Sequence, residues 1–211
     1  MEPTHRLLVR VLGQLTVFRP HPDGNYDVVA IRRSASQKIL LLLALHREGL
    51  HSADLKESIW PDVQCRAAHR RFLTSLSELR RILNTAAGMP VLRQGGDANA
   101  SRGARYWLGA KTVQVDLWQL RDLIGTAAST VQLSSRLALL RAAASLPMPD
   151  FAAVWDQEWI SDARSDVIHS LLGLYRDLAD SEIDPGIRVT WLLEASSLAP
   201  ADDVLHGRPS A

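Results

Sequence analysis

The order of strand-like and helix-like segments predicts an α+β domain followed by an all-α domain. Short alternating apolar runs begin the chain, three segments with helical spacing of apolar residues follow, and two strand-like runs come next. From Asp116 onward, apolar residues recur almost only at helical spacing. A small sheet, three helices and a hairpin, in that order, are the layout of a winged helix-turn-helix. We therefore predict a winged helix-turn-helix over residues 1–115 and an all-helical, tetratricopeptide-like domain over residues 116–211.

Strands are expected at both ends of the first domain. The sequence LLVRVLGQLTVF at 7–18 predicts two short strands separated at Gly13, and VVAI at 28–31 predicts a third, after the turn-forming HPDGN. These three strands predict a small antiparallel sheet at the N-terminus. The later strand-like runs lie at 91–93, 106–108 and 112–115.

Three helices are expected between these strands. Ser36 is the predicted N-cap of the first helix, which Gly49 ends. Ser52 is the predicted N-cap of the second, and Pro61 stops it. The third helix is expected over residues 64–83.

The third helix has two distinct faces on a projection of about 100° per residue. One face predicts a core stripe, formed by Ala68, Phe72, Leu76, Leu79 and Leu83. The opposite face carries three arginines and two hydroxyl groups, from Arg66, Arg70, Thr74, Ser77 and Arg81, with Glu78 on its flank. A solvated face has the same composition, but the third helix of a winged helix-turn-helix is the one that enters the major groove of DNA. We therefore predict that this face contacts double-stranded DNA, with Arg102 and Arg105 of the hairpin as further contacts.

The charges of the chain are unevenly distributed. Residues 1–111 contain 17 Lys/Arg and 9 Asp/Glu, whereas residues 112–211 contain 7 Lys/Arg and 14 Asp/Glu. This asymmetry predicts two modules with different partners, of which the first is suited to a polyanion.

The composition excludes several classes of protein. Cys65, the single cysteine, rules out a disulfide framework, and its place near the apolar side of the third helix predicts a packed thiol. The longest apolar run, residues 39–45, is far shorter than the roughly 18 residues of a membrane span. No secretory signal begins the chain. We therefore expect a cytoplasmic protein without a membrane partner.

Catalytic chemistry is not expected. None of the seven histidines forms a metal pair with a nearby acid, and the glycine-rich segments match no phosphate-binding loop. The acidic cluster at 156–166 predicts a solvated helix face. The six tryptophans are expected to be core or helix-packing residues. The sequence thus predicts no enzyme, no cofactor and no metal.

Several segments resemble a known family. LLVRVLGQLTVF, SQKILLLLALHREG, ADLKESIWPD and SLSELRRIL are similar to the winged helix of actinobacterial pathway-specific activators of the antibiotic-regulatory-protein type. EWISDARSDVIHSLLGLYRDLAD resembles the start of the bacterial transcriptional activator domain that follows in such proteins. Trp159, Arg164 and Val167 match the spacing of that motif.

The resemblance implies a transcriptional regulator that binds direct repeats near promoters and can contact RNA polymerase through its helical half. It places Arg70, Thr74, Ser77 and Arg81 on the recognition face, with Arg102 and Arg105 in the wing. The chain departs from the family in three ways. Glu78 stands where the family commonly has an arginine, the wing is longer, and too few helices precede Ala211 to complete the family's repeat module. The last departure predicts a fragment of a larger protein or a shortened relative.

Three functions remain in competition at this point, of which an enzyme is a distant third that only a pocket with paired titratable groups would support. The first is a sequence-specific DNA binder whose helical half docks a partner protein. The second is a protein-interaction module of a larger protein that keeps the winged-helix shape without binding DNA. Glu78 and the incomplete repeat favour the second, since a carboxylate repels phosphate. The basic first half and the arginine face of the third helix favour the first. An incomplete helical stack also predicts an uncovered apolar face, used by a homodimer or by further chain.

Overall fold

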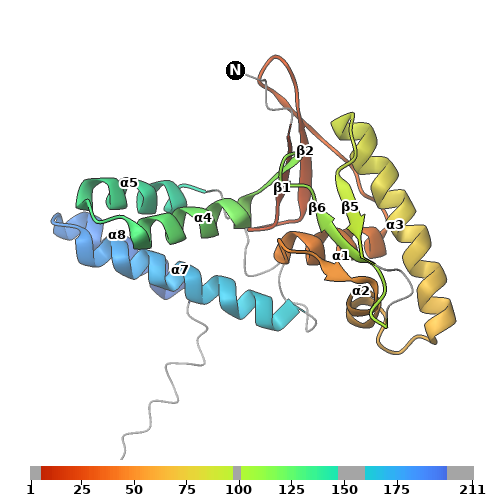
Figure 1. Ribbon diagram of the computed structural model, residues 1–211. Coiled ribbons are helices and arrows are strands. Elements are labelled where there is room, and N and C mark those ends of the chain that lie inside the picture. The colour runs from red at the N-terminus through yellow and green to blue at the C-terminus, as the bar shows by residue number, and fades with distance from the viewer. Residues whose placement is uncertain (1–5, 97–100, 147–159, 199–211) are drawn as a thin grey trace, which may run out of the picture. The chain divides into compact units, whose positions relative to one another are not determined.

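The computed structural model describes residues 6–96, 101–146 and 160–198 (Figure 1). Over these residues the protein is mixed α+β, with strands in the N-terminal part and helices after it, which confirms the predicted class at that level. The described residues form two compact units, one ending at Trp118 and the other beginning at Gln119. The predicted boundary between residues 115 and 116 falls at the start of helix α4 (Asp116–Ser129), which belongs to both units.

The first unit begins with a four-stranded sheet in the order β3-β2-β1-β7. Its strands are β1 (Leu7–Arg10), β2 (Thr16–Pro20), β3 (Tyr26–Val28) and β7 (Val113–Val115). The antiparallel sheet predicted from the first three strands is confirmed for β1–β3, and β7, whose place in a sheet was not predicted, pairs parallel with β1. A parallel pair requires a long crossover, and here all three helices of the unit lie between β1 and β7. The third strand lies earlier than its predicted range of 28–31.

The buried carboxylate of Asp116 fixes the end of β1 to the start of α4. Its oxygens accept hydrogen bonds from the backbone N–H groups of Val11, Leu12 and Leu117, at 2.8–3.1 Å. Burial raises the pKa of Asp116, and these three donors oppose that shift. The residue therefore has a structural role that its position in the sequence does not reveal.

Three helices follow the first strands: α1 (Ser34–Leu45), α2 (Ser52–Ile59) and α3 (Cys65–Ala87). Ser36 is not the N-cap of α1, because the helix begins two residues earlier, after Arg33. Its side chain is buried, and Oγ lies 3.1 Å from the Ser75 carbonyl oxygen of α3. The small residue thus lets two helices approach each other.

Ser52 is likewise not an N-cap but the first residue of α2. The backbone N–H groups of Ser52 and Ala53 donate to the carbonyl oxygens of Ala104 and Arg102, at 2.9 and 3.1 Å. A loop distant in sequence therefore satisfies the helix start, which normally needs a local side chain.

A second sheet has the order β4-β6-β5 and consists of β4 (Leu50–His51), β6 (Arg105–Leu108) and β5 (Leu92–Gly95). The predicted hairpin strands correspond to β5 and β6, which pair antiparallel. Gly49, at a φ of 81°, leads into β4. A Cβ atom there would overlap the carbonyl oxygen of Tyr106, so the close approach of β4 to β6 depends on glycine.

The core stripe predicted on α3 is confirmed. Ala68, Phe72, Leu76, Leu79 and Leu83 are all buried. Phe72 packs edge-on against Tyr106 of β6, with ring centroids 5.6 Å apart. The expectation for Cys65 was wrong, because this first residue of α3 is exposed.

The tryptophans differ in burial. Trp118 is buried, as expected, whereas Trp60, Trp107 and Trp191 are only half-buried. Trp155 and Trp159, and the acidic cluster up to Trp159, lie outside the described residues.

The described residues of the second unit form the remainder of α4 and the helices α5 (Leu133–Ala144), α7 (Ser161–Ser181) and α8 (Pro185–Leu198). Helix α7 buries one side, including Val167, Leu171 and Leu178, and its Tyr175 ring stacks on Trp191 of α8. An ion pair of 2.9 Å between Arg136 and Asp177 joins α5 to α7, and one of 2.8 Å joins Arg141 to Glu182, the residue after α7.

Helix α8 leaves much of its apolar surface uncovered by the described residues. Ile187, Val189, Leu192 and Leu193 are 44–65% exposed, and Ala195 is buried. Among the helices that the structure describes, none has the length and apolar content needed to cross a membrane.

Candidate nucleic-acid interface

The outer side of α3 is the most basic exposed surface that the sequence predicts. The structure exposes all five side chains of this face: Arg66, Arg70, Thr74, Ser77 and Arg81. The buried stripe on the opposite side anchors the helix in the core of the first unit. The face is therefore presented on a rigid element.

Four arginines of α3 are free to bind an external anion. Arg66, Arg70, Arg71 and Arg81 are exposed, and their side chains form no hydrogen bond or ion pair with any residue that the structure describes. Thr74 is different, since its Oγ1 donates to the Arg70 carbonyl oxygen at 3.0 Å. The guanidinium groups, with five N–H donors each, are suited to phosphate oxygens.

The carboxylate of Glu78, on the flank of this face, is paired with another residue of the protein. Its Oε2 atom lies 2.5 Å from Arg33 Nε and 3.1 Å from Ser36 Oγ, both in or beside the first turn of α1. The Glu78 side chain is 24% exposed and that of Arg33 is 51% exposed. The carboxylate is thus neutralised within the protein by a cation from another element.

A hollow of about 530 Å³ lies between α1 and α3, and we call it the α1–α3 hollow. Its lining residues are Arg33, Ala35, Trp60, Ala67, Arg70, Arg71, Thr74 and Ser75. Three of these are arginines and none is acidic. The hollow is therefore a concave extension of the basic surface of α3.

Sequence reasoning identified Arg70 and Thr74 in this group but not Arg33, Arg71 or Trp60. Arg71 was visible as the second member of the arginine pair that begins RRFLTSLSELRR. Arg33 lies directly before the first residue of α1, 45 residues from Glu78 in the sequence. No local pattern in the sequence connects those two residues.

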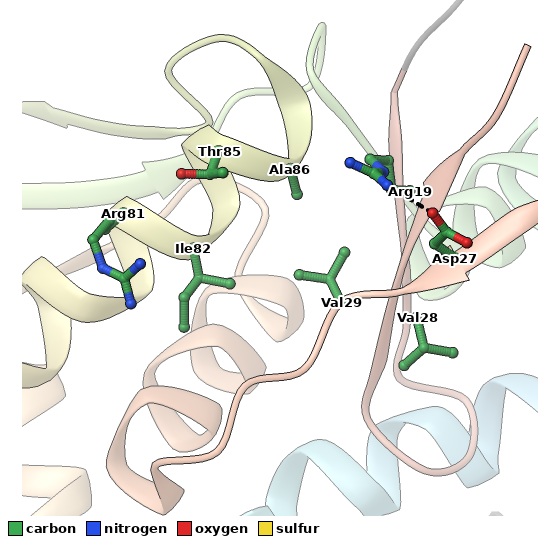
Figure 2. A pocket seen from close by; sticks show the side chains of 8 residues that line it. All are labelled: Arg19, Asp27, Val28, Val29, Arg81, Ile82, Thr85 and Ala86. Atoms are coloured by element: carbon green, nitrogen blue, oxygen red, sulfur yellow. Dashed lines mark hydrogen bonds and ion pairs between the residues drawn. The ribbon is translucent and has the colours of Figure 1, made fainter.

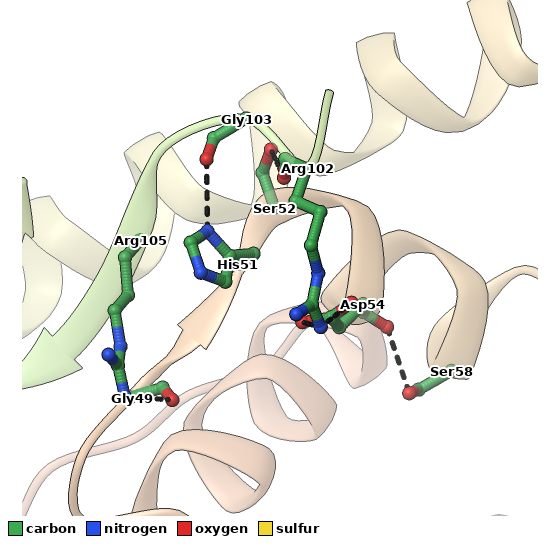
Figure 3. A network of polar contacts seen from close by, with 8 residues as sticks. All are labelled: Gly49, His51, Ser52, Asp54, Ser58, Arg102, Gly103 and Arg105. Carbon is green, nitrogen blue, oxygen red and sulfur yellow. Dashed lines mark hydrogen bonds and ion pairs between the residues drawn. The ribbon is translucent and has the colours of Figure 1, made fainter. Parts of the chain in front are cut away.

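The two arginines expected in the wing are engaged by the protein itself (Figure 3). Arg102 Nη2 lies 2.8 Å from each carboxylate oxygen of Asp54 in α2. Arg105 Nη2 lies 3.5 Å from the Gly49 carbonyl oxygen, and the His51 ring lies 3.1 Å from that of Gly103. These contacts fasten the segment before β6 to α2 and β4, chiefly through the Arg102–Asp54 ion pair, whereas Arg105 is exposed and its one contact is long.

A second hollow, of about 470 Å³, lies between the β2–β3 hairpin and the last turns of α3 (Figure 2). Ile82 and Ala86 line it from α3, and Val28 and Val29 line it from the hairpin side. Its polar edge contains Arg81 and an ion pair of 2.6 Å between Arg19 and Asp27. The hydrogen bond from Arg19 lowers the pKa of Asp27, and the nearby His21 adds to this shift.

This second hollow has less capacity for an anion than the first. Arg81 is its one lining arginine without a partner among the described residues, because Arg19 is paired with Asp27.

Metal chemistry has no support in the described part of the chain. No group of three or more His, Cys, Asp or Glu side chains is arranged there to hold a metal ion.

Comparison of the sequence with protein-family models and with curated proteins yields no match to either.

Proposed function

We propose that this protein is a DNA-binding transcriptional regulator. In this proposal the first unit is a winged helix-turn-helix, α3 enters the major groove, and the β5–β6 hairpin is the wing. One observation carries it: four arginines of α3 are exposed without a partner among the described residues, on a helix whose other side is held in the core. The positive charges on such a surface repel one another when nothing is bound. A polyanion would relieve that repulsion.

The pairing of Glu78 with Arg33 removes the main objection to this function. An unpaired acid on the recognition helix would oppose the release of counterions that drives binding to DNA. Here the carboxylate is bound to a guanidinium at 2.5 Å. The net charge near the middle of α3 remains positive.

The helical unit is proposed to be a tetratricopeptide-like module that docks a protein, either RNA polymerase, another regulator or a second copy of the chain. Its support is the packing of α7 against α8 and α5, together with the exposed apolar residues of α8. The resemblance to antibiotic-regulatory-protein type activators agrees with this arrangement.

Fluorescence anisotropy with a labelled DNA duplex across a salt series tests the proposed function. We expect binding at low salt, and a log–log plot against salt with a slope of about −0.9 for each phosphate contact. Four such contacts by α3 arginines give a slope of about −3.6. Absence of binding to any duplex at low salt would overturn the proposal.

The alternative is a protein-interaction module that no longer binds DNA. The observation that favours it is the internal pairing of Arg102, whose guanidinium is bound to both carboxylate oxygens of Asp54 instead of being free for phosphate. Under this alternative the parent chain does not bind DNA, so Arg70→Ala has no effect in the DNA-binding assay. Only substitutions on α8 alter the binding of a partner protein.

A further inference from the structure

The α1–α3 hollow is lined by three arginines, one of which, Arg33, forms an ion pair with Glu78 through its Nε atom. We propose that this hollow binds a phosphate group of the DNA backbone. Arg33, which lies outside α3, contacts the phosphate, and Glu78 positions Arg33. The inference rests on the proposed function and adds a specific contact to it. It also reverses the expected role of Glu78, from an acid that repels DNA to one that assists binding.

The charge balance of the hollow supports an anion as its occupant. Arg33, Arg70 and Arg71 line it, and Glu78, the carboxylate bound to Arg33, is not among its lining residues. Arg70 and Arg71 have no partner among the described residues. Two positive charges therefore remain after Glu78 has neutralised the third.

The geometry of the ion pair leaves the best phosphate donors of Arg33 available. Glu78 binds the Nε atom of the guanidinium, and no residue described by the structure binds its two terminal nitrogens. Those two nitrogens form the fork that matches two oxygens of one phosphate. A side-on contact with Glu78 and an end-on contact with phosphate can therefore exist at the same time.

Glu78 is itself held in place. Its Oε2 atom lies 3.1 Å from the hydroxyl of the buried Ser36, which shares its one proton between Glu78 and the Ser75 carbonyl oxygen. A fixed carboxylate restricts the rotamers of the half-exposed Arg33 before DNA arrives. A side chain that is already ordered loses less entropy on binding, which increases affinity.

The test compares Arg33→Ala, Glu78→Gln and the double variant with the parent chain, by anisotropy with a labelled duplex at salt concentrations from about 50 to about 200 mM. Arg33→Ala should weaken binding about tenfold, the effect of one charged hydrogen-bonded contact, and reduce the salt slope by about 0.9. Arg32→Ala is the matched control, because it removes the same charge from an exposed neighbour that does not line the hollow. It should change affinity much less.

Glu78→Gln separates the two roles of the carboxylate. If Glu78 merely repels phosphate, its neutralisation tightens binding and steepens the salt dependence. If it positions Arg33, Glu78→Gln weakens binding about threefold despite the added positive charge, and it has no further effect in the Arg33→Ala background. Arg33→Lys, which keeps the charge without the fork, should restore only part of the lost affinity.

Three results would overturn the inference. These are an unchanged salt slope in Arg33→Ala, an equal loss in Arg32→Ala, or tighter binding by Glu78→Gln. Thermal unfolding of each variant establishes that the fold is retained, and Arg33→Lys provides the comparison if Arg33→Ala does not fold. Failure of the parent to bind any duplex would remove the proposed function as well, whereas an unchanged slope in a parent that binds removes only the role of Arg33.

Discussion

Trp118 and Trp191 carry the same indole N–H group in different surroundings. Trp118 Nε1 donates to the Ala44 carbonyl oxygen at 2.6 Å, and Arg47 lies over its ring, 5.4 Å from the centroid. Trp191 Nε1 is buried without a partner among the described residues. A buried N–H without a partner carries a desolvation penalty, whereas the bond to Ala44 satisfies a carbonyl in the last turn of α1.

We therefore expect Trp118→Phe to lower the free energy of unfolding of the first unit more than Trp191→Phe lowers that of the second. The hydrogen bond alone contributes about 0.5–1.5 kcal/mol to the difference. Urea denaturation followed by circular dichroism measures both values. An equal decrease in the free energy of unfolding in the two variants would mean that the hydrogen bond from Trp118 to Ala44 does not stabilise the first unit.

Single residues also mark the limit of what the sequence predicts. The periodicity of α3 correctly predicted that Phe72 and Leu79 are buried and that Arg70 and Arg81 are exposed. The partner of Glu78 was not predictable, because Arg33 lies in another element and pairs with it only through tertiary packing. Burial follows from local period, whereas an ion pair between distant residues follows from the fold.

Gly49 and Gly88 allow a test of element packing, because both have a positive φ, of 81° and 68°. At Gly49 an added Cβ overlaps the backbone of Tyr106 in β6, and at Gly88, after α3, it meets open space. Gly88→Ala should therefore cost only the conformational strain, about 1 kcal/mol. Gly49→Ala should cost more than about 2 kcal/mol, because β4 must also move from β6.

Thermal unfolding of the two glycine variants under identical conditions measures this difference. The midpoint for Gly49→Ala should lie clearly below that for Gly88→Ala. Similar midpoints would mean that the contact between β4 and β6 is easily displaced.

Helix α3 and the hairpin should contribute differently to DNA binding. Arg70 has no partner among the described residues, whereas Arg102 is bound to both oxygens of Asp54. We expect Arg70→Ala to reduce the salt slope by about 0.9 and Arg102→Ala to leave it nearly unchanged. Because the Arg102 side chain is 64% exposed, loss of its pair with Asp54 should cost at most about 1 kcal/mol of stability. If Arg102→Ala reduced the salt slope as much as Arg70→Ala does, the hairpin would also contact DNA.

At the element level, helices were easier to predict than their ends. Apolar spacing predicted the three helices of the first unit and the helical character of the second, but neither Ser36 nor Ser52 is an N-cap. Carbonyl groups of the distant loop at Arg102 and Ala104 bind the start of α2 instead. The parallel pairing of β7 with β1 was also missed, because strand direction depends on the path of the whole chain.

For the whole molecule, the acidic second half and the exposed residues of α8 predict association through protein rather than nucleic acid. We expect the chain to form a dimer whose population rises with concentration, and Leu193→Asp, at the most exposed leucine of α8, to shift it to the monomer. Val131→Asp is the matched control, because Val131 is fully exposed outside α8. Light scattering measures both. A strict monomer at all concentrations would count against self-association through α8.

The exposure of Cys65 gives this protein a natural attachment point for a probe. It is the single thiol in the sequence, and it is the first residue of α3, directly before Arg66. A maleimide-linked fluorophore or a nitroxide spin label can therefore be attached at one defined position without removing any other cysteine. Quenching or a change in label mobility on addition of a ligand would then report directly on events at the start of α3.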